Sequence, residues 1–266
     1  MEVNVYSSNG EVKSKVKLPK VFETGYRPRI IRRAFLASLT SRIQPKGTDP
    51  RAGRKNTAVY KGVRRVRDSL IAVGIARKPR LKNRRGLREG NVAGIAGVVG
   101  GPRAHGPKAE KVIEEKINKK ERKLALASAI AALTNIELVK KRGHVFDEKL
   151  TLPIVFENDL EKKQKTKEII VFLEKLGIFQ DIERAKDKRI IRAGKGKVRG
   201  RKYKRAKSVL FIVKEDKSQL YKAARNLEGV DVVSVRNLCV EALAPAGQPS
   251  RFTLMSEDVL KELGKM

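Results

Sequence analysis

The chain has 266 residues, of which 62 are Lys or Arg and 29 are Asp or Glu, so its formal net charge is +33 at pH 7. A single cysteine and two histidines exclude an internal disulfide and argue against a thiolate or His-rich metal site. No stretch reaches the ~18 apolar residues of a membrane span, and no secretory signal is recognisable. We therefore expect a cytoplasmic protein with a polyanionic partner, of which nucleic acid is the common cellular example.

The first predicted element is a helix that begins at Pro28, a residue that suits the first turn of a helix. Apolar residues then recur every four positions, at Ile31, Phe35, Leu39 and Ile43. This spacing predicts a helix with one apolar face.

A long basic segment follows this helix. Between residues 42 and 105 the sequence has 17 basic and three acidic residues, a balance of +14, and many Gly and Pro residues that cannot seed a core. We interpret residues 45–107 as an extended loop that orders against an external polyanion. It would interrupt a single α/β domain over 1–266 with its core in 1–44 and 108–266. The alternative is a basic linker without a structured target.

The rest of the chain alternates helices and strands. Capping residues predict helix starts at Asn118 (with Glu121), Thr166, Ser218 and Ser256, and helix ends at Asn135, Gly177 and Gly229. Apolar runs predict strands at 153–156, 209–213 and 230–235. This alternation indicates an α/β fold, with a Rossmann-like, mostly parallel sheet, flanking helices and the long extended basic loop.

A second basic block lies just before the strand at 209–213. Residues 192–207 include nine basic residues and no acidic one, with Gly194, Gly196 and Gly200 among them. The glycines superficially suggest a dinucleotide-binding fingerprint, but the third comes one place late and the segment precedes a strand instead of following it. We expect a phosphate-contacting loop and no nucleotide cofactor; a solvated charge run is the alternative.

No motif indicates catalysis. His105 and His144 are isolated in basic surroundings; His105 could contact a base or a phosphate, and His144 could equally be a hydrogen-bonding residue of a turn. The sequence has no Gly-x-Ser-x-Gly motif, although a Ser–His–Asp or Cys–His site stays open at this point. We expect no enzymatic activity, no cofactor and no metal.

Composition also narrows the kind of polyanion. The first basic block favours arginine, which binds phosphate in a bidentate manner. Aromatic residues make up only 5% of the chain and Trp is absent, which argues against a platform for stacking single-stranded bases. The many Gly and Pro residues argue against an amphipathic membrane-binding helix. Folded, largely double-stranded RNA fits best.

Several short motifs together carry a resemblance to a known family. They are Arg103-Ala104-His105 with Pro107-Lys108, Asn118 to Ala125, Arg142-Gly143-His144, Ala193 to Gly196 with Arg199 to Tyr203, Ala224 to Leu227, and Leu243 to Gly247. With them the sequence resembles the L-four family of large-subunit ribosomal proteins, in its archaeal and eukaryotic-type form. The resemblance covers nearly the whole chain.

The resemblance implies a structural constituent of the large ribosomal subunit that supports subunit assembly. The long loop would penetrate the large-subunit rRNA, and its tip near 74–90 would line the nascent-peptide exit tunnel with Arg77, Arg80, Arg84 and Arg85. The implied partners are large-subunit rRNA and neighbouring ribosomal proteins on the cytoplasmic ribosome. We expect no membrane partner and no homo-oligomer.

The residues predicted to bind rRNA are the basic side chains of the two blocks and their neighbours. In the first block they are Arg51, Arg54, Lys55, Lys61, Arg64, Arg65, Arg67, Arg77, Lys78, Arg80, Lys82, Arg84, Arg85, Arg88, Arg103, His105 and Lys108; in the second, Lys195, Lys197, Arg199, Arg201, Lys202, Lys204 and Arg205. The alternatives are an extraribosomal RNA-binding regulator or RNA chaperone and, behind these, an RNA-acting enzyme.

Overall fold

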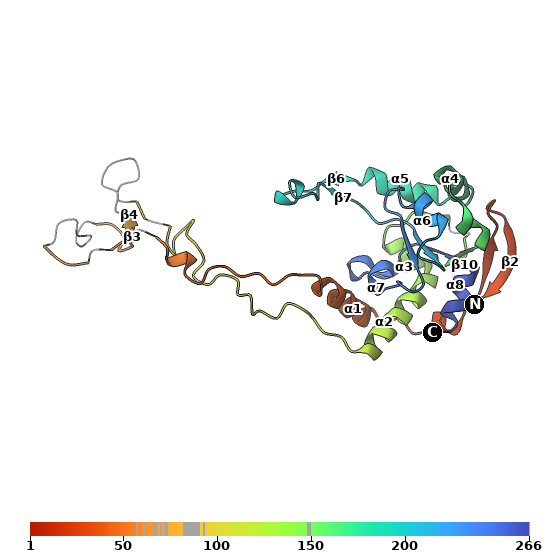
Figure 1. The fold of residues 1–266 in the computed structure, drawn as a ribbon, viewed down its shortest axis with the longest axis horizontal. Coiled ribbons are helices and arrows are strands. Elements are labelled where there is room, and N and C mark those ends of the chain that lie inside the picture. Colours follow the sequence, from red (N-terminus) through yellow and green to blue (C-terminus); the bar gives the residue numbers. More distant parts are fainter. Residues whose placement is uncertain are drawn as a thin grey trace. The chain divides into compact units, whose positions relative to one another are not determined.

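The computed structural model describes residues 1–56, 58–60, 62–65, 69, 71, 74–81, 91–92, 94–147 and 150–265. Contacts divide the chain into two compact units (Figure 1). Unit 1 comprises Met1–Ser41 and Glu115–Met266, and unit 2 comprises Arg42–Glu114.

Unit 1 is built on a six-stranded sheet with the strand order β2-β1-β5-β10-β8-β9. The strands are β1 (Glu2–Tyr6), β2 (Val12–Lys17), β5 (Ile154–Phe156), β8 (Leu210–Val213), β9 (Asp231–Ser234) and β10 (Thr253–Ser256). Only β1 and β2 pair antiparallel; every other pair is parallel. Strands β5, β8 and β10 are buried along their whole length. All residues of β5 and β8 are apolar, as expected of strands covered on both faces.

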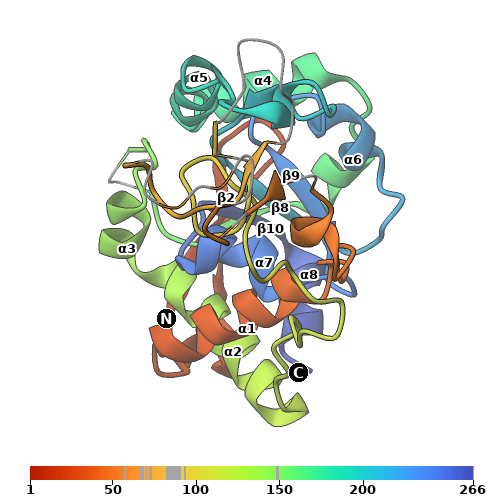
Figure 2. The same cartoon turned by 90° about the vertical axis from the view of Figure 1, so that its left-hand side faces the viewer.

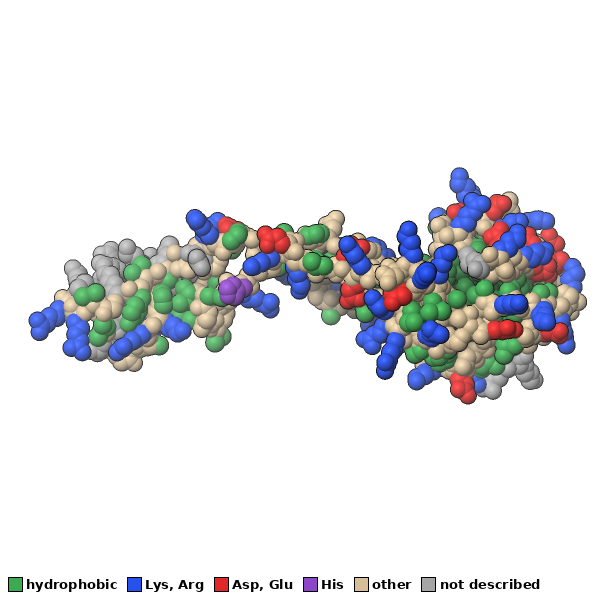
Figure 3. All heavy atoms as spheres, turned by 90° about the horizontal axis from the view of Figure 1, so that it is seen from below, with side chains coloured by type: hydrophobic (Ala, Val, Ile, Leu, Met, Phe, Trp, Pro, Cys, Tyr) green, Lys and Arg blue, Asp and Glu red, His purple; other side chains and the backbone are tan. Residues whose placement is uncertain are grey.

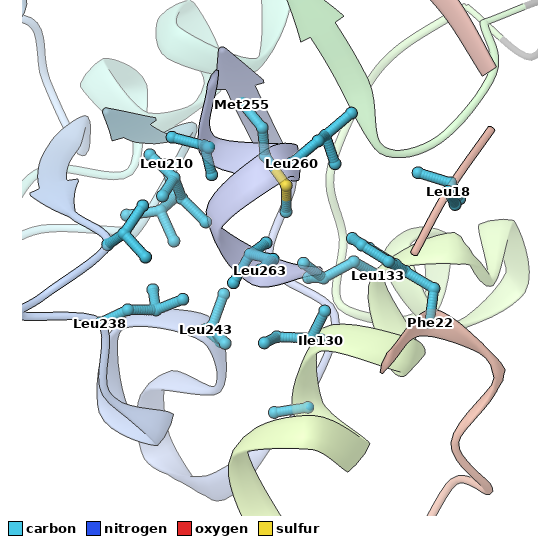
Figure 4. Packing of buried hydrophobic residues seen from close by; sticks show 14 of the residues in the cluster. Leu18, Phe22, Ile130, Leu133, Leu210, Leu238, Leu243, Met255, Leu260 and Leu263 are labelled. Atoms are coloured by element: carbon cyan, nitrogen blue, oxygen red, sulfur yellow. The ribbon is translucent and has the colours of Figure 1, made fainter. Parts of the chain in front are cut away.

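Helices cover both faces of this sheet, so that unit 1 has three layers (Figure 2). The helices are α1 (Pro28–Thr40), α2 (Lys119–Ala131), α3 (Ile136–Lys141), α4 (Thr166–Lys175), α5 (Phe179–Asp187), α6 (Gln219–Ala224), α7 (Val240–Leu243) and α8 (Glu257–Leu263). Alternate residues of each strand point to opposite faces. Thus Leu210 and Ile212 pack with α1, α2, α7 and α8, whereas Phe211 and Val213 pack with α4, α5 and α6. The first of these cores is shown in Figure 4. The predicted α/β class with a mainly parallel sheet is confirmed.

The predicted apolar face of α1 is partly wrong. The helix begins at Pro28 as expected, but it buries Ile31, Ala34 and Ala37. Leu39 is exposed, and Ile43 is exposed beyond the end of the helix. A strict four-residue spacing turns by about 40° at each step, because a helix has about 3.6 residues per turn. After two such steps, at Leu39, the side chain no longer faces the core.

The capping predictions locate the helices, and Gly177 follows the end of α4 as expected, but several details are wrong. Helix α6 ends at Ala224, five residues before Gly229. Asn118, Ser218 and Ser256 each precede a helix, yet none of their side chains makes a capping hydrogen bond, and Thr166 lies inside α4. Asn135 starts a helix as well as ending one, because its side-chain oxygen accepts from the N–H groups of Glu137 and Leu138 at 3.0 and 3.3 Å.

Unit 2 has little regular structure among its described residues. Strands β3 (Ala58–Val59) and β4 (Arg80–Leu81) pair antiparallel, and Ala52–Arg54 form one turn of 3-10 helix. Outside this pair, the segment near Thr48 lies beside the segment near Pro107, where the Thr48 N–H donates to the Pro107 carbonyl at 3.2 Å. A backbone hydrogen bond therefore joins the two flanks of unit 2 beyond the β3–β4 pair.

Candidate nucleic-acid interface

The second basic block forms a short arm of unit 1, which we call the basic arm (residues 190–204). Strands β6 (Ile190–Ile191) and β7 (Tyr203–Lys204) pair antiparallel, and the N–H of Arg192 donates to the carbonyl of Lys202 at 2.8 Å. Between them, Gly194 and Gly200 have φ angles of 77° and 76°, which side chains disfavour. Figure 1 shows the arm leaving the body of unit 1 between α5 and the central sheet.

Two carboxylates tie the base of the basic arm to unit 1. Glu228 pairs with Arg189 at 3.1 Å and with Arg205 at 3.6 Å, one from each side of the arm. Asp231 pairs with Lys207 at 2.7 Å. Arg205, which the sequence predicts to bind RNA, is therefore already paired with Glu228. This ion pair also helps to orient the arm.

Beyond this base, the basic side chains of the arm have no acidic partner. None of them forms an ion pair with a carboxylate in the part of the chain that the structure describes, and all are exposed. They are Arg192, Lys195, Lys197, Arg199, Arg201, Lys202 and Lys204. Seven exposed cations on one short element repel one another, and a polyanion would relieve this repulsion. Figure 3 shows the excess of basic over acidic side chains on one face of the protein.

One aromatic ring lies among these cations. The Arg189 guanidinium lies 4.0 Å from the centre of the Tyr203 ring, and the Lys202 ammonium lies 5.5 Å from it. Such cation–π contacts favour one orientation of the ring and of both side chains. They add to the ion pairs that orient the base of the arm.

A buried arginine supports the strands from which the arm extends. The Arg251 side chain is 1% exposed. Its guanidinium donates to the carbonyls of Ser208 (2.7 Å), Val209 (3.0 Å) and Gly229 (2.8 Å), and to the Asp231 carboxylate at 2.6 Å. Burial lowers the pKa of Arg251, and Asp231 opposes that change. The guanidinium thus joins β8, β9 and β10 at their amino ends.

Gly229 sits where this joint leaves no room for a side chain. Its φ is +76°, and a Cβ there would lie 2.6 Å from the carbonyl oxygen of Ala206 and 2.9 Å from the amide nitrogen of Ser208. The close approach of the segment before β8 to the turn before β9 therefore requires glycine. Glycine at this position thus lets the end of the basic block, at Ala206, pack against the turn before β9.

Ser208, Asp181 and His144 come together, but not in a catalytic arrangement. The Asp181 carboxylate lies between the other two, 3.0 Å from the His144 Nδ1 and 2.6 Å from the Ser208 hydroxyl. The Nε2 of His144 accepts the Phe252 N–H at 3.4 Å, which assigns the proton to Nδ1. The serine therefore has no base to activate it, and all three side chains are buried. The cluster is structural, which removes the Ser–His–Asp reading.

The environment of this cluster perturbs two pKa values. Burial lowers the pKa of His144 more than the Asp181 carboxylate raises it. Burial alone would raise the pKa of Asp181, but hydrogen bonds from His144, Ser208 and Arg184 outweigh it and lower this pKa to about 2. An ionised Asp181 and a neutral His144 are therefore the forms at neutral pH.

The predicted residues of unit 2 fall into three groups. Arg51, Lys55, Arg64, Arg65, Arg77, Lys78, Arg103, His105 and Lys108 are exposed, while Arg80 is half-buried and donates to the Ala76 carbonyl at 3.1 Å. Lys55 pairs with Asp49, which lowers the pKa of Asp49. The residues Lys61, Arg67, Lys82, Arg84, Arg85 and Arg88 and the side chain of Arg54 lie outside the described part of the chain.

Three of the predicted residues share one hollow. Arg103, His105 and Lys108 line it together with Lys46 and Lys111, which the sequence-based set does not include. Lys46 belongs to the other flank of the loop, about sixty positions away, so its proximity has no local signal in the sequence. Of the four predicted tip residues, only Arg77 and Arg80 are described, and neither lines this hollow.

Nothing in the described residues suggests a metal centre or a membrane span. Across that part of the chain, no group of three His, Cys, Asp or Glu side chains is placed to hold a metal ion. The helices described there are too short or too polar to cross a bilayer.

These features define a mixed α/β protein whose exposed segments carry a large uncompensated positive charge. Residues 16–266 match the model of the ribosomal protein L4/L1 family. The chain belongs to this family.

Relatives from archaea match it over nearly their whole length. The large ribosomal subunit protein uL4 of Methanocaldococcus jannaschii is 47% identical over 265 residues, covering 99% of this chain and 98% of that protein. The proteins of the same name from Thermoplasma acidophilum (45%; 98% and 97% covered) and Methanopyrus kandleri (44%; 99% and 98% covered) are similarly close. The family that the short motifs suggest is confirmed.

Proposed function

We propose that this protein is a structural constituent of the large ribosomal subunit that binds large-subunit rRNA through the basic arm and unit 2. Membership of a ribosomal protein family and the names of its archaeal relatives support the ribosomal role. The observation that carries the rRNA contact is the set of seven exposed cations on the arm without an acidic partner among the described residues.

The physical role of the arm follows from its construction. The ion pairs of Glu228 and Asp231 hold its base, so the cations beyond the base act from a defined position. Each phosphate that they neutralise releases condensed counterions, which gives binding a steep dependence on salt. Such contacts orient a protein on RNA while reading little sequence, so selectivity would come from the shape of the folded RNA.

Unit 2 would enter the rRNA. By resemblance to the family, its tip near 74–90 lines the nascent-peptide exit tunnel with Arg77, Arg80, Arg84 and Arg85. The exposure of Arg77 and the basic balance of the whole unit support this proposal. Neutralising phosphates there would let RNA helices approach one another, which is a contribution to subunit assembly and requires no catalysis.

Sedimentation of a cell extract tests the ribosomal role. After a high-salt wash, quantitative immunoblotting measures the copies of this chain per large subunit. About one copy that survives the wash is the result expected for a structural constituent of the cytoplasmic ribosome. Release of the chain from intact subunits, or a mostly free pool, would overturn the proposal and favour an RNA-binding regulator or RNA chaperone.

A further inference from the structure

The two flanks of unit 2 run antiparallel in a single register. The Thr48 N–H donates to the Pro107 carbonyl. A Cβ at Gly47 would lie 3.3 Å from the Ala109 amide nitrogen, and a Cβ at Gly53 would lie 3.3 Å from the Arg103 carbonyl oxygen. From Gly47 to Gly53 on the first flank, the facing residue on the second runs back from Ala109 to Arg103, and glycine allows the two backbones to approach closely.

This register creates a hollow with an excess of positive charge. The hollow has a volume of about 700 Å³ and is lined by Lys46 from the first flank and, from the second, by Arg103, His105, Gly106, Pro107, Lys108, Glu110 and Lys111. Four cations against one carboxylate leave a formal balance of +3 with a neutral imidazole. None of the four cations forms an ion pair with a carboxylate in the described ranges.

The chemistry of the lining is that of an oxyanion site. A guanidinium can bind two phosphate oxygens at once, ammonium groups supply point charges, and an imidazole can donate through a ring nitrogen. Gly106 brings the backbone close, since a Cβ there would clash with the Thr48 hydroxyl. Of the lining residues other than glycine, only Pro107 has an apolar side chain.

We propose that this hollow binds adjacent backbone phosphates of an RNA strand, with Lys46 and Lys111 as additional contact residues. The inference rests on the proposed function and assigns it a defined subsite. A balance of +3 in a volume of about 700 Å³ matches two neighbouring phosphodiesters better than one carboxylate side chain. The hydrogen bond from the Thr48 N–H to the Pro107 carbonyl brings the two flanks together beside the hollow.

The two histidines make a direct test possible, because His105 lines the hollow and His144 is buried in unit 1. Proton NMR of the full chain follows both imidazoles while inorganic phosphate replaces chloride at constant ionic strength. We expect the His105 resonances to move to saturation and those of His144 to stay. Equal movement of His105 in chloride would overturn the proposal.

Matched variants separate the hollow from the general charge of the protein. Lys46→Gln with Lys108→Gln removes two cations from the hollow, and we expect phosphate to bind about tenfold more weakly. Lys15→Gln with Lys17→Gln removes the same charge from the exposed strand β2 and should leave the affinity unchanged. Equal losses in both variants would show that only net charge matters, which contradicts the proposal. Unchanged His144 resonances report that unit 1 of each variant is folded.

Binding of large-subunit rRNA distinguishes failure of the subsite from failure of the proposed function. We expect the K46Q/K108Q change to lower the slope of log affinity against log salt by about two, and K15Q/K17Q to leave it unchanged. If the chain binds rRNA with the same slope in both variants, the hollow is overturned and the function stands. If phosphate binds the hollow but the chain does not prefer rRNA to other RNA, the function fails and the anion site stands. Displacement of RNA by equimolar polyglutamate would instead assign the hollow to an acidic protein partner.

Discussion

The guanidinium of Arg251 lies 2.6 Å from the carboxylate of Asp231, the same carboxylate that holds Lys207 at the base of the basic arm. Burial alone would raise the pKa of Asp231, but Arg251 and Lys207 outweigh it and keep the carboxyl ionised. One carboxylate thus links the interior of the sheet to the proposed RNA-binding surface.

Replacing Arg251 with methionine should destabilise the protein severely. The change would leave the carbonyls of Ser208, Val209 and Gly229 without their donor and remove the buried partner of Asp231. We expect a loss of about 3 kcal/mol or more in the free energy of unfolding, measured by urea denaturation. Arg236→Met, at an exposed position, is the control and should change it by less than about 0.5 kcal/mol. A similar small loss for both would contradict the assigned role.

Stability should fall in acid because of the His144–Asp181 pair. The pKa of His144 is lower in the folded chain than in the unfolded chain. The free energy of unfolding therefore begins to fall as the pH drops below ~6.5, because the unfolded chain takes up the proton first. The pKa of Asp181 is lowered to about 2, so its contribution is present above ~3.9 and is lost as the pH falls from there towards 2. The loss from Asp181 amounts to about 2–3 kcal/mol in the free energy of unfolding.

Unfolding of the Asp181→Asn variant in urea at several pH values checks this assignment. We expect lower stability than the native chain at pH 7 and a flatter dependence below pH 4, because the titrating carboxyl is gone. Asp187→Asn, an exposed change on the same helix α5, should keep the native pH profile. An unaltered acid limb in Asp181→Asn would show that other carboxyl groups dominate it.

The cations beyond the base of the arm should contribute to RNA binding without contributing to folding. Changing Lys197, Arg199 and Arg201 together to glutamine should remove about three phosphate contacts. The slope of log affinity for rRNA against log salt should therefore become smaller by about three. The free energy of unfolding should not fall, since none of the three has an acidic partner in the described part of the chain. Lys15, Lys17 and Lys20 changed to glutamine provide the charge-matched control, and an equal loss of slope there would refute a specific role for the arm.

Glu228 should position the arm without touching RNA. The Glu228→Gln variant loses both ion pairs at the base, so the arm should open more often. We expect the Arg192 amide, which donates across the arm, to exchange its hydrogen about tenfold faster. Hydrogen exchange followed by mass spectrometry measures this, with the exposed Glu183→Gln as a control. Unchanged exchange in the arm would mean that the β6–β7 pairing alone holds it.

The broad features of the protein were readable from local patterns. Net charge indicated a polyanionic partner, and apolar runs located β5, β8 and β9. Strands β5 and β8 are buried along their whole length, and such strands have few polar residues. Strands β1, β2 and β10 were missed: β1 carries only Val3 and Val5 as alternating buried aliphatics, β2 is mostly exposed, and β10 has only Leu254 and Met255 between Thr253 and Ser256. Such short patterns do not stand out from a loop.

The details of the candidate sites depended on contacts between distant residues. Glu228 reaches Arg189 across 39 positions, and the His144 side chain meets Phe252 across 108. Lys46 and Arg103 share a hollow because backbone pairing sets the register of their flanks. Charge, hydropathy and periodicity act over a few residues, so they specify which side chains are available and where helices and buried strands form. Which cations have partners, and which remain available for an external anion, follows from long-range packing, because an ion pair depends on distance in space and not along the chain.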